Sequence, residues 1–218
     1  MTRIICDASA LISMSENCLL CILRNLNNEL IITPSVEQEI VKDPYRTKRF
    51  KLKSIQLNQL IKEGVIKVST HPKLKDEADL ITKKANEMLE MNGKRIRIMH
   101  QGEAETIALC KLTNADAILV DERTARHLIE KPEKIRDYMQ SRMKRKIKIN
   151  KKIMDEITRE IGNINVIRSA ELISYSYEKQ IMSQCKMENA LEAALYAVKF
   201  AGCSITEEEI KEYVKMLG

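Results

Sequence analysis

The stretch RIICDASALI at residues 3–12 decides the fold. Its apolar run at residues 3–6 has the length of a short buried strand, and Asp7 ends that run. Over residues 9–26 apolar side chains then recur at helical spacing, which predicts a helix. A strand that leads directly into a helix indicates the first half of a strand–helix–strand unit.

The same alternation continues along the chain. Further strands are predicted at residues 30–32, 65–68, 117–120 and 164–167. Helices are predicted between them at residues 34–41, 50–63, 74–91, 102–112 and 123–129. Because such alternation builds right-handed parallel crossovers, we expect an α/β fold of three layers, with a mainly parallel central sheet between two helical layers. Two more helices, at residues 187–201 and from Thr206 to Leu217, predict a C-terminal helical hairpin.

Composition places the chain among globular proteins. The 218 residues are 44% hydrophobic and 31% charged, with 6 Gly, 4 Pro and no Trp, which favours a helix-rich domain over a linker. No apolar run approaches the roughly 20 residues that span a bilayer, so we expect no membrane partner. The first residues reach Asp7 after only three apolar side chains, which is atypical of a signal peptide. We therefore expect a cytoplasmic protein.

The cysteines give little evidence for a metal site. The chain has six of them, and in a cytoplasmic protein most should be reduced and buried. Cys18 and Cys21 have the spacing of a zinc half-site, but no second pair supplies the other two ligands.

Positive charge is concentrated in one segment. Residues 131–152 hold ten Lys and Arg against two acids, a balance of +8, so the other 196 residues carry −2 of the net +6. Such a segment either binds phosphates or is a solvated helical face. As candidate nucleic-acid contacts we take its central cations: Lys144, Arg145, Lys146, Lys148, Lys151 and Lys152.

Acidic residues stand at corresponding places in the predicted elements. Asp7 and Asp121 each follow a predicted strand. Two predicted helices carry acids in their first turns, namely Glu37, Glu39, Glu103 and Glu105. Sites in parallel sheets form at the carboxyl ends of strands, and gathered carboxylates suit a hard divalent cation. Helix capping and the helix dipole are the structural alternative for each acid taken alone.

Four of these segments together resemble the motifs of PIN-domain proteins, in the order of that family. They are IICDASALI at residues 4–12, ITPSVEQEI at 32–40, GEAETIAL at 102–109 and ILVDERTAR at 118–126. The resemblance implies a compact three-layer α/β/α fold and a ribonuclease that depends on Mg²⁺ or Mn²⁺.

The resemblance also assigns the site. It implies Asp7, Glu39, Glu103 and Asp121 as catalytic acids, with Asp7, Glu103 and Asp121 as the metal ligands. Glu39 is preferred over Glu37 because it directly precedes Ile40, and Glu103 over Glu105 because it directly follows Gly102. Ser9 and Glu122 are expected in supporting positions.

One residue departs from the family pattern. Many relatives carry a polar residue two positions before the fourth acid, where this chain has Leu119. On the strength of the four acids, the primary hypothesis is an endoribonuclease, of a toxin or an RNA-processing type, with RNA, an antitoxin-like or other protein, or a second copy as partners. The alternative is a PIN scaffold that binds nucleic acid or protein with little or no turnover.

We expect a PIN-like core at residues 1–129, a basic helical insertion at 130–161, the last core strand at 162–173 and a helical extension at 174–218.

Overall fold

A five-stranded parallel sheet forms the centre of the molecule. The computed structural model describes residues 2–182 and 187–217. Strand order in the sheet is β3-β2-β1-β6-β8, and every pairing is parallel. The strands are β1 (Arg3–Cys6), β2 (Glu29–Ile32), β3 (Ile66–Val68), β6 (Ala117–Leu119) and β8 (Val166–Ile167). The predicted α/β class and parallel sheet are confirmed.

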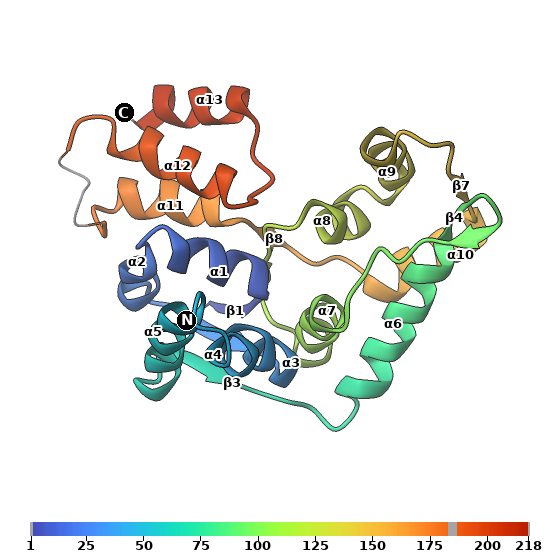
Figure 1. The fold of residues 1–218 in the computed structure, drawn as a ribbon, viewed down its shortest axis with the longest axis horizontal. Helices are drawn as coiled ribbons and strands as arrows, with labels where there is room; N and C mark the ends of the chain where they lie inside the picture. The colour runs from blue at the N-terminus through green and yellow to red at the C-terminus, as the bar shows by residue number, and fades with distance from the viewer. Residues whose placement is uncertain (1, 183–186, 218) are drawn as a thin grey trace.

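Alternate residues of β1 face two different cores. Ile4 and Cys6 pack with one cluster of buried side chains, whereas Ile5 packs with the other, as expected from the two-residue period of a strand. The first cluster includes side chains of α1 (Ala8–Glu16), α2 (Leu20–Asn25) and α5 (Lys51–Lys62). The second includes those of α6 (Leu74–Met88), α7 (Gln101–Thr113) and α8 (Arg123–Glu130). The sheet therefore lies between two helical layers (Figure 1).

The helix that follows β2 is interrupted by a wide turn. It begins as α3 (Pro34–Glu37), where the Thr33 hydroxyl accepts a hydrogen bond from the backbone N–H of Val36 at 3.3 Å. It widens into the π-helical turn η1 (Gln38–Lys42) and ends as α4 (Asp43–Tyr45). Such turns are frequent at functional sites, because they reorient the side chains that they carry.

Two predicted helices are shorter than expected. The helix predicted over residues 9–26 is divided between α1 and α2, where Cys18 has a φ of 57°. The helix predicted over 74–91 ends at Met88, and β4 (Leu89–Met91) pairs antiparallel with β5 (Lys94–Arg95). Asn92 and Gly93 both have positive φ, which is the backbone of a tight hairpin turn. The prediction of a helix at residues 89–91 was wrong. The turn after Met91 and the pairing with β7 (Lys148–Ile149) place these residues in a small second sheet.

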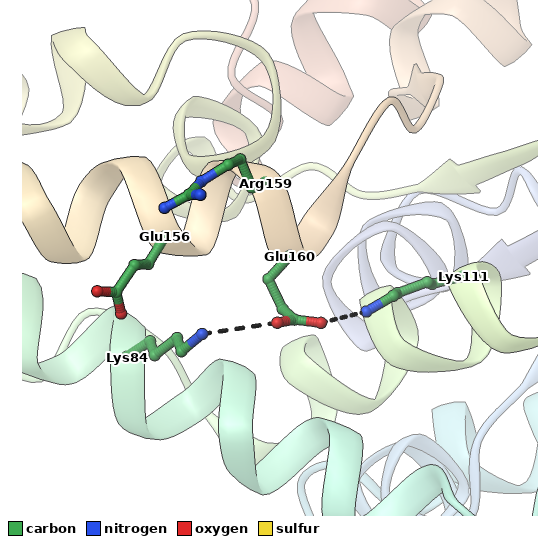
Figure 2. A pocket seen from close by; sticks show the side chains of 5 residues that line it. All are labelled: Lys84, Lys111, Glu156, Arg159 and Glu160. Atoms are coloured by element: carbon green, nitrogen blue, oxygen red, sulfur yellow. Dashed lines mark hydrogen bonds and ion pairs between the residues drawn. The ribbon is translucent and has the colours of Figure 1, made fainter.

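The expected insertion at residues 130–161, which holds the basic segment, folds onto the second core. It contains η2 (Pro132–Lys134), α9 (Ile135–Met143), β7 and α10 (Lys151–Ile161). Buried Ile135, Ile157 and Ile161 join it to that core. Figure 2 shows Glu160 of α10 between Lys84 of α6, at 3.5 Å, and Lys111 of α7. This cluster of charges links three helices on the outer surface.

The C-terminal helices pack against the first core. They are α11 (Ser169–Glu178), α12 (Ala190–Phe200) and α13 (Glu207–Leu217). Leu191, Leu195 and Val198 of α12 and Ile210 of α13 are buried in the same cluster as β1. At the start of α13, Thr206 and Glu209 form the predicted capping box, with hydrogen bonds of 3.1 and 2.8 Å. The expected boundary between residues 173 and 174 falls inside α11.

The described cysteines form no disulfide, and Cys6, Cys110 and Cys203 are buried. Cys185 lies outside the described residues. In the described part of the chain, none of the helices combines the length and the apolar character that a bilayer span requires.

Candidate active site

Asp7 occupies the junction between β1 and α1. Its carboxylate caps α1, accepting hydrogen bonds from the Ser9 backbone N–H at 3.0 Å and from the Ser9 hydroxyl at 2.6 Å. Only 3% of the residue is exposed, and this burial raises the pKa of Asp7, against the effect of the Ser9 hydrogen bonds. The charge of Glu122 raises it further. Asp7 is thus a helix cap whose carboxylate also lies near a second acid.

Glu39 reaches the same region from η1. Burial raises the pKa of Glu39, and the charges of Asp7 and Asp43 add to that effect. Gly102 makes room for this side chain, because a Cβ at residue 102 would lie 3.3 Å from Glu39 Oε2. Glu37 has a different environment, since it forms an ion pair of 2.7 Å with Lys42. Of these two acids, Glu39 is the one that lies near Asp7.

Glu103 approaches from the first turn of α7. Its carboxylate accepts the His100 backbone N–H at 2.7 Å. Burial raises the pKa of Glu103 to about 8, and the charges of Asp7, Glu122 and Glu39 contribute to the increase. Glu105 instead accepts hydrogen bonds from the backbone and hydroxyl of Ser35, at 3.2 and 2.6 Å, and so ties α7 to α3.

Asp121 lies at the same edge of the sheet, but its carboxylate is bound elsewhere. The Asp121 backbone N–H donates to the Ser9 hydroxyl at 3.1 Å, which places β6 beside Asp7. The carboxylate accepts from the Ser169 backbone N–H at 2.8 Å and from the Ser169 hydroxyl at 2.7 Å. Burial raises the pKa of Asp121, and the neighbouring charge that adds to the increase is that of Glu171 in α11.

Glu122 lies near Asp7 and Glu103. Together with Glu39, these acids form the electrostatic group of the candidate site. The Glu122 carboxylate caps α8, accepting from the Ala125 backbone N–H at 2.8 Å and the Thr124 hydroxyl at 2.9 Å. Its charge raises the pKa of both Asp7 and Glu103. The structure therefore gathers Asp7, Glu39, Glu103 and Glu122, and joins Asp121 to Ser169.

The chemistry of this group fits a hard divalent cation. Carboxylate oxygens are the preferred ligands of Mg²⁺ and Mn²⁺, and a cation offsets both the burial and the mutual repulsion that raise these pKa values. Across residues 2–182 and 187–217, however, no three His, Cys, Asp or Glu side chains stand close enough together to hold one ion. The carboxyl groups must therefore rotate toward one another to bind a metal.

A cleft of about 400 Å³ opens beside these acids. Glu103 and Glu122 line it together with Arg97, His100 and Arg142. The sequence did not identify these two arginines as candidate contacts, because the candidates were chosen only where positive charge is densest along the chain. The candidate cations Lys144, Arg145, Lys146, Lys148, Lys151 and Lys152 are exposed around β7 and do not line this cleft.

Comparison with known proteins adds one positive finding. A family model described as a PIN domain matches residues 3–136, which include β1, η1, α7 and α8. No curated protein matches the chain.

Proposed function

Because the chain belongs to the PIN-domain family, whose fold is of a nuclease type, we propose that it is a metal-dependent endoribonuclease that hydrolyses RNA phosphodiester bonds. The supporting observation is the electrostatic group at the edge of the sheet, where Asp7, Glu39 and Glu103 arrive from three separate elements. Burying carboxylates side by side lowers stability, so their convergence needs a reason other than folding.

We assign the metal to Asp7, Glu103 and Asp121. Bound there, Mg²⁺ or Mn²⁺ would activate water and neutralise charge on the phosphate. Asp7 contributes a carboxylate whose orientation is set by Ser9. For Asp121 to take part, its carboxyl group must first leave Ser169.

Glu39 is assigned the proton transfer. Burial raises its pKa toward the range in which a carboxylate accepts a proton efficiently near neutral pH. Gly102 holds open the space in which this side chain lies. Glu122 supports the group from the start of α8.

The decisive experiment is cleavage of a fluorescent RNA with Mn²⁺ or Mg²⁺ by the wild type and by Asp7→Asn. We expect metal-dependent cleavage that Asp7→Asn abolishes. Glu37→Gln is the matched control, since Glu37 belongs to the same helix as Glu39 but pairs with Lys42, and it should retain activity. Absence of cleavage by the wild type with either metal would contradict the proposal.

A second candidate function is a PIN scaffold that binds RNA or protein without turnover. Two observations favour it: Leu119 is fully buried where many relatives have a polar residue, and the carboxylate of Asp121 is already satisfied by Ser169. RNA binding by a wild type that does not cleave would support this candidate.

The proposed partners are RNA and, for a toxin-type enzyme, an antitoxin-like protein; self-association is a further proposal. A small reading frame immediately upstream of the gene would favour the toxin type over an RNA-processing enzyme. Sedimentation of the pure protein tests whether it forms a homodimer.

A further inference from the structure

The cleft beside the acids is lined by side chains of both charges. The acids are Glu103 and Glu122, and the arginines are Arg97, from the connection between β5 and α7, and Arg142, from α9. In Figure 1, α9 lies beside α8. The cleft thus combines the candidate site with an element of the basic segment.

Both arginines are available to a ligand. Neighbouring Arg95, Arg126 and Arg136 each form an ion pair, with Glu87, Glu130 and Asp137 respectively. Within the described residues, neither Arg97 nor Arg142 has an acidic partner, and both are exposed. A guanidinium without a carboxylate partner can bind a phosphate through two parallel hydrogen bonds.

The backbone around each arginine is held in place. Ile96 and Ile98, on either side of Arg97, are buried, and the Ile98 and Met99 N–H groups donate to Asn86 Oδ1 at 2.7 and 3.0 Å. After α9, the Ile147 N–H donates to Gln140 Oε1 at 2.9 Å. The two charges are therefore carried by ordered backbone, which reduces the entropy lost when a ligand binds.

Apolar side chains also line the cleft. Ile96, Ile98, Met139 and Met143 contribute to this surface. Methionine side chains are polarizable and pack well against aromatic rings, so they suit the face of a nucleobase without selecting its identity. A volume of about 400 Å³ is in the range of small-ligand sites and is too small for a duplex.

We propose that this cleft binds one nucleotide unit of a single-stranded RNA, with Arg97 and Arg142 on its phosphates and its base against Met139 and Met143. The assignment rests on the proposed nuclease function, because it places the strand beside Glu103 and Glu122. Arg97 and Arg142 lie outside the dense run of cations at residues 144–152, and they are the proposed contacts nearest the reacting phosphate.

The test measures binding of a short fluorescent single-stranded RNA by anisotropy, without divalent metal, over a range of salt concentrations. Arg97→Gln/Arg142→Gln should weaken binding by roughly tenfold for each arginine, as expected for charge-assisted hydrogen bonds. The slope of log affinity against log salt should fall by about 1.4, since each single-strand phosphate that is bound contributes about 0.7. Arg97→Lys/Arg142→Lys should restore the slope but only part of the affinity.

The matched control is Lys62→Gln/Lys215→Gln, which removes the same charge from exposed positions on α5 and α13, away from the cleft (Figure 1). Equal weakening by both double variants would overturn the proposal, as would tighter binding of a duplex than of a single strand. Single-stranded DNA of the same sequence is a further arm, and affinity equal to that of RNA would overturn the assignment to RNA.

This result is separable from that of the cleavage assay. Binding that depends on Arg97 and Arg142 in a protein that never cleaves RNA would retain the cleft and reject the nuclease. Cleavage by a double variant with unchanged RNA affinity would retain the nuclease and reject the cleft. Thermal melting of both double variants checks that the fold is intact.

Discussion

The carboxylate of Asp121 accepts two hydrogen bonds from Ser169, one from the backbone N–H at 2.8 Å and one from the hydroxyl at 2.7 Å. This pair joins the edge of the sheet to the start of α11. The Ser204 N–H also donates to the Asp121 carbonyl at 3.2 Å, and Arg168 donates to the Ser204 carbonyl at 2.8 Å. The C-terminal helices are therefore anchored at Asp121, two residues after the end of β6 and next to the candidate site.

Ser169→Ala should destabilise the protein. The substitution removes a hydroxyl donor to a buried carboxylate, which costs about 1–3 kcal/mol and lowers the melting temperature by several degrees. Ser13→Ala is the control, because Ser13 is equally buried and its hydroxyl has no hydrogen-bond partner within the described residues. We expect Ser13→Ala to melt unchanged or higher. Equal melting of the two variants would show that the hydrogen bond from the Ser169 hydroxyl to Asp121 contributes nothing to stability.

The sequence predicts the edge at which the acids gather but not which carboxylates face one another. Asp7 and Asp121 follow adjacent parallel strands, and parallel strands end at the same edge. The partner of Asp121, however, is 48 residues away in a helix whose sequence carries no motif. A contact of that range depends on how α11 docks, which local spacing does not specify.

Gly102→Ala should separate folding from catalysis. Alanine favours a helix by about 1 kcal/mol over glycine, so the fold should be retained or strengthened. The new Cβ would lie 3.3 Å from Glu39 Oε2 and should displace that carboxylate. Cleavage of RNA with Mn²⁺ should therefore be slowed severalfold at an unchanged or higher melting temperature. Cleavage at the wild-type rate by this variant would show that Glu39 does not carry the proton transfer.

Glu103→Gln should stabilise the metal-free protein, and more so at higher pH. Glutamine can still accept the His100 N–H, so the cap of α7 is kept. The pKa of Glu103 is about 8 in the folded state, above its ordinary value of 4.5, so its ionisation costs stability progressively as pH rises from about 4.5 to 8.

Melting in a chelator checks this expectation. At pH 5 the two proteins should melt alike, and at pH 8 the variant should be more stable by on the order of 1 kcal/mol or more. Added Mn²⁺ should stabilise the wild type by mass action and the variant less. A pH-independent difference would contradict the electrostatic explanation.

The small sheet of β4, β5 and β7 shows why some elements escape sequence reasoning. Residues 89–91 continue the apolar spacing of α6, so periodicity alone predicts a longer helix. The Asn92–Gly93 pair is the local signal of a hairpin, but β4 also pairs with β7, more than 50 residues later. Only the docking of α9 and α10 brings that strand into place.

The C-terminal helices should be part of the folding unit. Leu195 is fully buried in the cluster that contains β1, so Leu195→Ala should cost about 2–5 kcal/mol. Phe200→Ala on the same helix is the control, because Phe200 is 82% exposed and its loss should change stability little. Deletion of residues 185–218 should likewise lower solubility or stability. A truncated protein that melts unchanged would show that these helices are an independent appendage.

Neutralising Lys144, Arg145, Lys146 and Lys148 together tests the basic segment. These side chains are exposed where the chain leaves α9, the helix that supplies Arg142 to the cleft, so they are placed to bind phosphates further along the strand. The quadruple variant should weaken binding of all RNA sequences alike and flatten the salt slope by up to about 0.7 for each phosphate that the variant no longer binds.

The affinity of the quadruple variant for Mn²⁺ should be unchanged, because none of the four substituted side chains belongs to the electrostatic group around Asp7. Calorimetry with Mn²⁺ alone provides that control. The two sets of cations are expected to bind different parts of the strand. Removal of Arg97 and Arg142 should slow cleavage even at saturating RNA, because they are the contacts nearest the reacting phosphate. Removal of the exposed cations should weaken binding only, so a higher RNA concentration should restore the cleavage rate. Unchanged affinity and salt slope in the quadruple variant would show that this segment is only a solvated face.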